Sequence, residues 1–473
     1  MMTLTVATPK PGYPLGQLLL HNIHGPLHAF VVAMFRLVSE NDGWLRLPGA
    51  AAGTASVALL FRWLRPRFGS RAALWGALLL AVSPLHIHYS QELRNYSFAL
   101  CFVLLSLVQL DRLMERWTRA GAVRFALCAA AALLSNFSAA FILAVQSVAF
   151  LRGGGWTRRA LARWALTVAL VTVLASPWIY RVTTYVDFGR LATPVLPGDI
   201  DVSERLRGDT TVRLEAIPYA FYTYSVGFTL GPSLAELHEN ASLAVLLARH
   251  GAAILWVGLL FGALLGLGLA RAPAKSVNHS GGWTALEPLL YLLVPMVATL
   301  ALNWQNAKAF NMRYVLVGLP GYLALLAVGL ASLRRGDVRV GAGVAVLATC
   351  ALSLRHHYFD PRYAKEDVRG ATRAVEARLL PGECIFAPTV WQIVGHYQRG
   401  DAPVHYVFRE PPELVRRQLD GLYGTCASFW YLRARPWVDD PDGRVLAELG
   451  SRYQLGERLE FAGVTALHYT RKN

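Results

Sequence analysis

The residues best suited to chemistry lie in a polar segment between two apolar runs, SPLHIHYSQELRNYSFAL at 83–100. The segment holds His88, Gln91, Glu92 and Arg94, which are groups that can bind a proton or a phosphate. A plain connector between two helices needs only a few turn residues. The segment therefore predicts a functional site, and Arg94 is its candidate anion ligand.

Three further polar clusters flank apolar runs. HNIHGPLH at 21–28 contains His24, GWLRLPG at 43–49 contains Arg46, and NWQNAKAFNMRY at 303–314 contains Lys308, Arg313 and Tyr314. Ionisable groups beside the bilayer are costly and often functional, although arginine and lysine at helix ends can also extend to the interface without further role. Guanidinium groups bind phosphate in a bidentate way. We predict that the three clusters with arginine or lysine converge on an anionic headgroup such as a lipid phosphate.

A metal site is the alternative use of His86, His88 and Glu92. Zinc sites normally draw three or four protein ligands from more than one segment. A short loop with two histidines falls below that pattern, so we expect no metal.

The composition indicates a membrane protein. The chain has 473 residues, of which 54% are hydrophobic and 16% are charged, whereas soluble domains carry about 25% charged residues. The apolar residues form continuous runs, and about 20 such residues cross a bilayer. We predict a polytopic α-helical membrane protein with ten spans, at 47–61, 72–86, 97–111, 125–135, 137–151, 164–180, 251–270, 284–302, 314–333 and 340–354.

The net charge of +16 is concentrated in alternate loops. Basic short loops stay on the cytoplasmic side of a membrane, so the charge indicates orientation rather than binding to nucleic acid. Residues 26–39 are then an interfacial helix, because a span there would place the four arginines of 62–71 outside. The remaining loops, with residues 83–100, lie on the outer face. The basic loops are 62–71, 112–124, 152–163, 271–275 and 334–339.

We divide the chain into an outer-face loop with the interfacial helix at 1–46, a transmembrane domain at 47–354 with an outer loop at 181–250, and an extracytoplasmic α/β domain at 355–473. Helical and strand patterns alternate in the last part, which is typical of an α/β domain. We expect a helix near 364–379, strands near 384–387, 403–407 and 427–432, and a terminal pair of strands near 457–470.

Two features of these regions leave alternatives open. Cys384 and Cys426 either form a disulfide, if their segment is extracytoplasmic, or remain free thiols, which we favour. The aromatic residues of IPYAFYTYSVGF at 217–228, such as Tyr224, either stack on a sugar or form an interfacial belt, which we favour.

Four segments resemble a known family. They are residues 24–100, from HGPLH to NYSFAL, and then ASPWIY at 175–180, NMRYVLVGLPGYLALLAVGL at 311–330 and YFDPRYAKEDVRGATRAV at 358–375. Together they resemble the GT-C glycosyltransferases, in particular bacterial glycosyltransferase family 39 and the dolichyl-phosphate-mannose protein mannosyltransferase-like proteins. The resemblance implies transfer of a sugar from a polyprenyl monophosphate to an acceptor on the outer membrane face.

The resemblance also assigns residues. His24 matches the histidine of a His-Pro-Pro-like motif, and Arg94 matches the arginine after Gln-Glu. Arg313 and Tyr314 match an Arg-Tyr pair at a late span. The resemblance implies that Arg94, Arg313 and Tyr314 bind the donor phosphate. We expect the site to be lined by His24, His88, Gln91, Glu92 and Lys308.

The family's acidic pair, which follows a first helix and is thought to act as base, would lie upstream of Met1 and has no counterpart in this sequence. The catalytic residues are therefore unknown. Either the start codon is assigned too late, which we favour, or the chain is a catalytically impaired relative. Glu92 is then expected to hold Arg94 in position rather than to act as base.

We expect a glycosyltransferase of the bacterial inner membrane, with its C-terminal domain outside. It would use a polyprenyl-phosphate sugar, a glycan, lipid or protein acceptor, and no cofactor, divalent metal or nucleic acid. The alternative is a protein that binds or translocates lipid-linked sugars. A translocase would place charged residues deep in its spans, and the sequence has few there.

Overall fold

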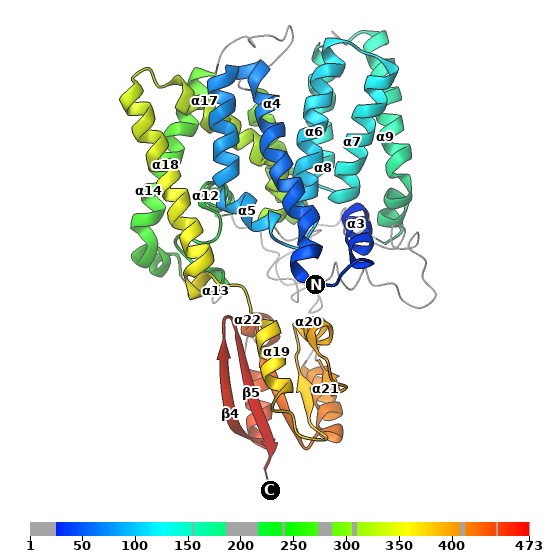
Figure 1. Ribbon diagram of the computed structural model, residues 1–473, viewed down its shortest axis with the longest axis vertical. Helices are drawn as coiled ribbons and strands as arrows, with labels where there is room; N and C mark the ends of the chain where they lie inside the picture. The colour runs from blue at the N-terminus through cyan, green and yellow to red at the C-terminus, as the bar shows by residue number, and fades with distance from the viewer. Residues whose placement is uncertain are drawn as a thin grey trace.

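The computed structural model describes residues 25–153, 156–185, 216–238, 242–272, 286–304, 310–406, 412–440 and 443–472. A helical bundle forms one part, and a small α/β domain lies at one end of it (Figure 1). The bundle comprises α3 (Pro26–Arg36), α4 (Asp42–Val82), α5 (Pro84–Ser90), α6 (Tyr96–Glu115), α7 (Arg119–Ser135), α8 (Ala139–Gly153), α9 (Arg158–Tyr185), α12 (Ala216–Val226), α13 (Leu234–His238), α14 (Leu243–Arg271), α15 (Leu286–Trp304), α16 (Met312–Val315), η1 (Leu316–Gly318), α17 (Leu319–Ser332) and α18 (Gly336–Phe359).

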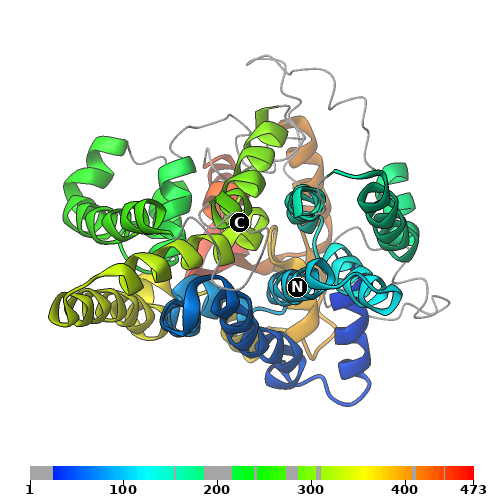
Figure 2. The same ribbon diagram turned by 90° about the horizontal axis from the view of Figure 1, so that it is seen from above.

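The predicted fold class is confirmed. Six helical segments of the described residues are long and apolar enough to cross a membrane, and α4 among them covers two of the predicted spans. The other three predicted spans coincide with the shorter helices α7, α8 and α15. Seen from above, the helices pack side by side as a bundle (Figure 2). Each predicted apolar run therefore forms a helix or one arm of a helix.

Helix α4 consists of two arms that meet at Gly69. This glycine has φ 80° and ψ 168°, a conformation open essentially only to glycine. The first arm leads away from the α/β domain and the second arm returns toward it (Figure 1). One glycine thus folds a continuous helical sequence into the two predicted spans 47–61 and 72–86.

Arg67 lies two residues before this turn and is buried. Its guanidinium donates to both carboxylate oxygens of Asp111 in α6, and to the Glu287 carboxylate of α15 at 3.2 and 3.3 Å. Arg67 belongs to the predicted basic segment 62–71, and its charge is buried and paired. The three charges form a buried ion cluster at the bundle end remote from the α/β domain.

The aromatic segment of α12 packs inside the bundle. Tyr224 is 1% exposed, its ring stacks on Tyr322 with a centroid distance of 5.4 Å, and its hydroxyl donates to the Val315 carbonyl. An interfacial belt is thus the wrong prediction for Tyr224, which is a core residue. The predicted outer loop 181–250 contains α12 and α13, while its residues 186–215 and 239–241 lie outside the described residues.

The α/β domain is built on one mixed sheet with the strand order β2-β1-β3-β5-β4. Strand β1 runs parallel to β2 and β3, and β5 runs antiparallel to β3 and β4. The strands are β1 (Cys384–Phe386), β2 (Val404–His405), β3 (Ser428–Arg433), β4 (Tyr453–Phe461) and β5 (Val464–Arg471), and the helices are η2 (Pro361–Tyr363), α19 (Val368–Glu376), α20 (Trp391–Tyr397), α21 (Pro412–Thr425), α22 (Pro436–Asp439) and α23 (Arg444–Arg452).

Each face of the sheet has its own core, because successive strand residues point to opposite sides. Ile385 belongs to the cluster that includes Val375 of α19 and Val394 of α20. Its neighbour Phe386 belongs to the cluster that includes Leu422 of α21 and Leu449 of α23. Helices therefore cover both faces, and the strands lie where the alternating pattern predicted them.

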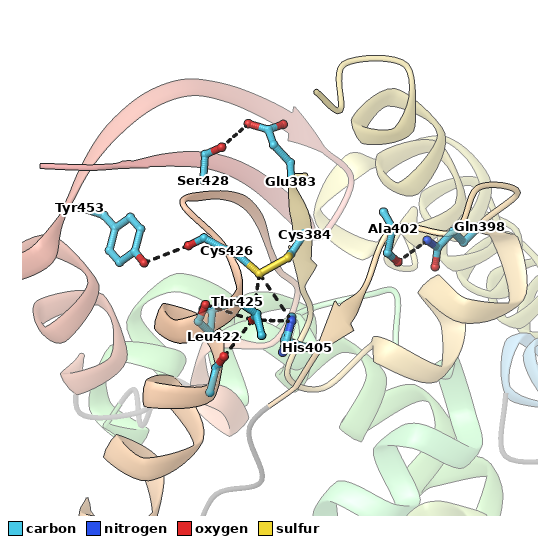
Figure 3. The surroundings of a disulfide bond; sticks show 11 residues. Glu383, Cys384, Gln398, Ala402, His405, Leu422, Thr425, Cys426, Ser428 and Tyr453 are labelled. Carbon is cyan, nitrogen blue, oxygen red and sulfur yellow. Dashed lines mark hydrogen bonds between the residues drawn. A yellow bond between two sulfur atoms is a disulfide. The ribbon is translucent and has the colours of Figure 1, made fainter. Parts of the chain in front are cut away.

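A disulfide joins Cys384 at the start of β1 to Cys426 just before β3 (Figure 3). The prediction of free thiols, which we favoured from the sequence, is therefore wrong. The Nε2 atom of His405 lies 3.5 Å from the Cys426 sulfur and 3.3 Å from the Thr425 hydroxyl oxygen. These two sulfurs and this imidazole form a group of three potential metal ligands, but the disulfide engages both sulfurs.

Candidate functional site

The turn between α5 and α6 is held close to the start of α3. The Asn95 side-chain amide donates to the Ser135 carbonyl at the end of α7. Gly25 has φ +85°, and a Cβ on it would overlap that carbonyl oxygen and the Asn95 amide. Glycine in His-Gly-Pro thus lets the chain ahead of α3 pass directly beside residue 95. The neighbouring Arg94 is positioned by this contact.

Arg94 is held by Tyr96, which packs against a second tyrosine. Its guanidinium donates to the Tyr96 hydroxyl at 3.1 Å and lies 5.6 Å from the centroid of the same ring. The Tyr96 ring contacts that of Tyr89 edge to face, with centroids 4.9 Å apart. Because Tyr96 uses the guanidinium face and one donor, other donors of Arg94 are left for a ligand.

Arg313 reaches the same pair from α16. It interacts electrostatically with Tyr89 and Tyr96, and it hydrogen-bonds the Tyr314 hydroxyl, above whose ring its guanidinium lies at 5.0 Å from the centroid. Its Nε atom is buried without a hydrogen-bond partner in the described part of the chain. Buried donors are normally satisfied, so this one is suited to an anionic ligand. We call Arg94, Arg313, Tyr89 and Tyr96 the arginine–tyrosine site.

His28 lies beside this site. The residue is 2% exposed and its ring contacts Phe98 at 5.1 Å. Burial and then the charge of Arg94 lower the pKa of His28 to about 3. His28 is therefore neutral at physiological pH, and the positive charge of the site comes from its two arginines.

His88, Gln91 and Glu92 form a junction with the segment that leads to the α/β domain. Glu92 accepts a hydrogen bond from Lys365 at 3.1 Å and lies 3.3 Å from the Nε2 atom of His88. The Gln91 amide donates to the Tyr358 hydroxyl at 2.5 Å. The prediction that Glu92 holds Arg94 is wrong: Tyr96 holds Arg94, while Glu92 pairs with Lys365 and His88.

The charge state of Glu92 follows from these contacts. Burial alone would raise the pKa of the Glu92 carboxyl, but the hydrogen bond from His88 and the charges of His88 and Lys365 lower it to about 2. Glu92 is thus a carboxylate at neutral pH and a weak base. The histidines at 86 and 88 also diverge, since the Nδ1 atom of His86 bonds the Leu80 carbonyl instead of facing Glu92.

Asp42 makes a second junction with the α/β domain. Its carboxylate accepts a hydrogen bond from Arg369 of α19 at 2.9 Å and one from the Tyr397 hydroxyl of α20 at 3.0 Å. Glu40 pairs with Arg36 at 2.7 Å. The acidic residues that the sequence offered near the first span therefore serve in ion pairs and docking.

Among the predicted site residues, Arg94 contacts Tyr96 and Arg313 contacts Tyr314, and Tyr96 lies within electrostatic range of Arg313. Two of the predicted lining residues, His24 and Lys308, lie outside the described residues. Met1, upstream of which the family's acidic pair is expected, lies outside them as well. The expectation about that pair therefore stays a prediction, and the described residues assign no catalytic base.

Sequence reasoning missed Tyr89 as part of the site. A signal was present, because Tyr89 and Tyr96 flank Arg94 in the same polar segment. Two tyrosines on either side of an arginine are able to hold its guanidinium through ring and hydroxyl contacts. The segment 83–100 therefore contains Arg94 and also the tyrosine that holds its guanidinium.

Residues 23–180 match the family described as dolichyl-phosphate-mannose-protein mannosyltransferase. The fold is similar to that of ArnT from Cupriavidus metallidurans in the apo state, with 14% sequence identity and a TM-score of 0.52, over 94% of this chain and 87% of that chain. The predicted resemblance to the GT-C glycosyltransferases is confirmed. The structure of the same ArnT bound to undecaprenyl phosphate gives 15% identity and a TM-score of 0.52, with the same coverage. No curated protein sequence matches the chain.

The family match and the fold similarity support a multi-pass membrane glycosyltransferase of the GT-C type. The matched segment contains Arg94, Tyr89 and the bundle side of the two junctions, while Arg313 and Tyr314 lie beyond it.

Proposed function

We propose that this chain transfers a sugar from a polyprenyl-monophosphate donor to an acceptor at the membrane face that carries the α/β domain. The observations that carry the proposal are the hydrogen bond of Arg94 to Tyr96 and the buried, unpartnered Nε atom of Arg313, which lies within electrostatic range of Tyr89 and Tyr96. Two guanidinium groups match the charge and geometry of a phosphate. The solved ArnT complex with undecaprenyl phosphate has a similar fold, which favours this class of lipid.

The proposed chemistry is a single displacement. An acceptor hydroxyl oxygen bonds to the anomeric carbon as the bond from that carbon to the phosphate oxygen breaks. The polyprenyl phosphate leaves with one more negative charge, and the acceptor loses a proton to a base. Arg94 and Arg313 stabilise the charge that develops on the departing phosphate.

We propose that Glu92 does not serve as the base. A carboxylate with a pKa of about 2 binds a proton poorly at neutral pH. Asp42 is engaged by Arg369 and Tyr397. Both acids fit docking of the α/β domain, and the base remains unassigned.

Three further expectations belong to the proposal. The arginines supply the positive charge, so transfer proceeds without a divalent metal. The chain resides in a bacterial inner membrane, with the α/β domain on the outer side. The Cys384–Cys426 disulfide fits this orientation, because disulfides persist in oxidising compartments.

The test is sugar transfer by the full chain in nanodiscs, from radiolabelled polyprenyl-phosphate hexose to a panel of glycan, lipid and peptide acceptors, with and without EDTA. Arg94→Ala and Arg313→Ala should each lower the transfer rate about 100- to 1000-fold, the cost of removing one charge-stabilising donor. Arg362→Ala is the matched control, because Arg362 is an exposed arginine paired with Asp360 in the α/β half.

Each outcome has a defined meaning. Full transfer by Arg94→Ala would refute the phosphate role of this residue. Arginine-dependent binding of the donor, with no transfer to any acceptor, would replace the transferase by a donor-binding protein. Loss of transfer in EDTA that Mg²⁺ or Mn²⁺ restores would refute the metal-free reaction.

Translocation of a lipid-linked sugar is the competing function, and the buried charges of the bundle bear on it. Arg67 lies two residues from the turn at Gly69, Asp111 lies four residues from the end of α6, and Glu287 is the second residue of α15. At 1.5 Å per residue, each lies within about 6 Å of a helix end. The cluster is therefore at the edge of the bundle and does not form a charged path across it, which favours the transferase.

A further inference from the structure

A long groove is lined by the two arms of α4, by α5 and by the C-terminal part of α6. Its volume is about 1030 Å³. Small apolar residues such as Ala50, Ala58, Ala77 and Ala81 form much of its wall. From Ala50 to Arg65 the first arm advances 15 residues, or about 22 Å. The groove is thus longer than one bilayer leaflet, whose hydrocarbon half is about 15 Å thick.

The two ends of the groove differ in charge. At the end near the α/β domain the polar lining residues are His86, Ser90 and Gln91, which include no arginine or lysine. At the remote end the groove is lined by three exposed arginines from two helices, which we call the groove arginines: Arg62, Arg65 and Arg112.

Two acidic residues also line the remote end, and they do not cancel its positive charge. Asp111 is bound to the buried Arg67. Glu115 contributes one negative charge against three positive ones. The remote end therefore keeps a net positive charge where the apolar groove meets the membrane surface, which is complementary to an anionic headgroup on an apolar chain.

We propose that the groove binds one anionic phospholipid from the leaflet remote from the α/β domain. An acyl chain lies between the arms of α4, and the phosphate is bound by the groove arginines. This site is separate from the arginine–tyrosine site, which lies at the opposite end of the bundle. The cations at the remote end favour a phospholipid of that leaflet over the donor, whose phosphate would lie near Arg94.

The experiment uses the full chain in nanodiscs of equal phosphatidylglycerol and phosphatidylcholine, followed by native mass spectrometry of the retained lipid. We expect one phosphatidylglycerol per chain, retained at least tenfold over phosphatidylcholine. Changing all three groove arginines to Gln should abolish the preference. The matched control removes three exposed arginines at the same end that do not line the groove, Arg116, Arg119 and Arg124.

A second variant separates binding from folding. Ala58→Trp fills the apolar part of the groove and leaves every charge in place, so it should reduce lipid retention while the chain stays monodisperse in size-exclusion chromatography. Equal retention of the two lipids by the wild type, or equal loss in the groove and control triple variants, would overturn the proposal. Displacement of phosphatidylglycerol by polyprenyl phosphate in one-to-one competition would assign the groove to the donor and overturn it as well.

Discussion

Replacement of Arg67 should destabilise the bundle more than replacement of either of its partners. The Arg67 guanidinium contacts both carboxylates, donates to the Trp63 carbonyl at 3.3 Å and lies 5.1 Å from the centroid of the Trp63 ring. The ionic side chains of Arg67, Asp111 and Glu287 are each 8% exposed. Arg67→Gln therefore leaves two buried carboxylates facing each other without a cation.

The expected cost follows from burial. Breaking a buried ion pair by removing one partner costs about 3–5 kcal/mol, because a charge remains uncompensated. A change of 1 kcal/mol shifts the melting temperature by about 2–4 °C in a domain of 150–250 residues. For this larger bundle we expect Arg67→Gln to lower the melting temperature by roughly 5–10 °C.

Replacements of the two acidic partners of Arg67 should differ in their cost to stability. Asp111 binds Arg67 through both oxygens, whereas Glu287 makes longer contacts at 3.2 and 3.3 Å. With both acids ionised the cluster carries one excess negative charge, so Glu287→Gln removes the excess and should cost least. We expect the loss of stability to rank Arg67→Gln above Asp111→Asn above Glu287→Gln.

The assay is thermal unfolding of the full chain in detergent, followed by intrinsic fluorescence and by size-exclusion chromatography after heating. Arg71→Gln is the control, since Arg71 is an exposed arginine just past the turn at Gly69. The reasoning is refuted if Arg67→Gln melts within 1 °C of the wild type, or if Glu287→Gln is as damaging as Arg67→Gln.

Three further changes test other features of the chain. Gly69→Ala should cost about 1–3 kcal/mol and lower the yield of folded protein in size-exclusion chromatography, because the backbone there has φ 80°, whereas Gly258→Ala, at a helical position with open space, should not. The pKa of the Glu92 carboxyl is lowered to about 2, so its contribution to docking of the α/β domain is complete above its unfolded pKa near 4.5 and is lost as the pH falls toward 2. Hydrogen exchange of residues 88–92 measures this loss, and Lys365→Met should move it to higher pH. An unchanged pH profile would contradict the ion pair. The disulfide closes a separation of 42 residues and should contribute about 4 kcal/mol to the α/β domain; a reductant should lower the melting temperature of the wild type and leave that of Cys384→Ala unchanged.

The bundle could be predicted from the sequence because its signal is local. A run of apolar residues forms a helix in a bilayer whatever it packs against, since lipid offers no other partner for the backbone. The predicted spans therefore match observed helices. The same logic failed for Tyr224, because a short apolar aromatic segment fits an interface and a core equally well, and only packing against Tyr322 distinguishes them.

The candidate site could be predicted only in part, because its partners are far apart in the sequence. Arg94 was identified from its polar neighbours, but the pairing of Glu92 with Lys365 joins residues 273 positions apart. The pairing of Arg67 with Glu287 spans 220 positions. Local sequence patterns indicate which charged side chains need a partner when they are buried. The fold determines which residue is that partner.

The two ends of the bundle use charge in different ways. At the remote end Arg67 is satisfied by two carboxylates, so its charge stabilises the packing of three helices. Near the α/β domain, Arg94 and Arg313 are held by tyrosines, which orient a guanidinium without neutralising it. The nearby acids Asp42 and Glu92 are engaged by Arg369 and Lys365 of the segment after α18, and are thereby kept from the two arginines. This separation leaves the site its positive charge, which the proposed departure of a lipid phosphate would use.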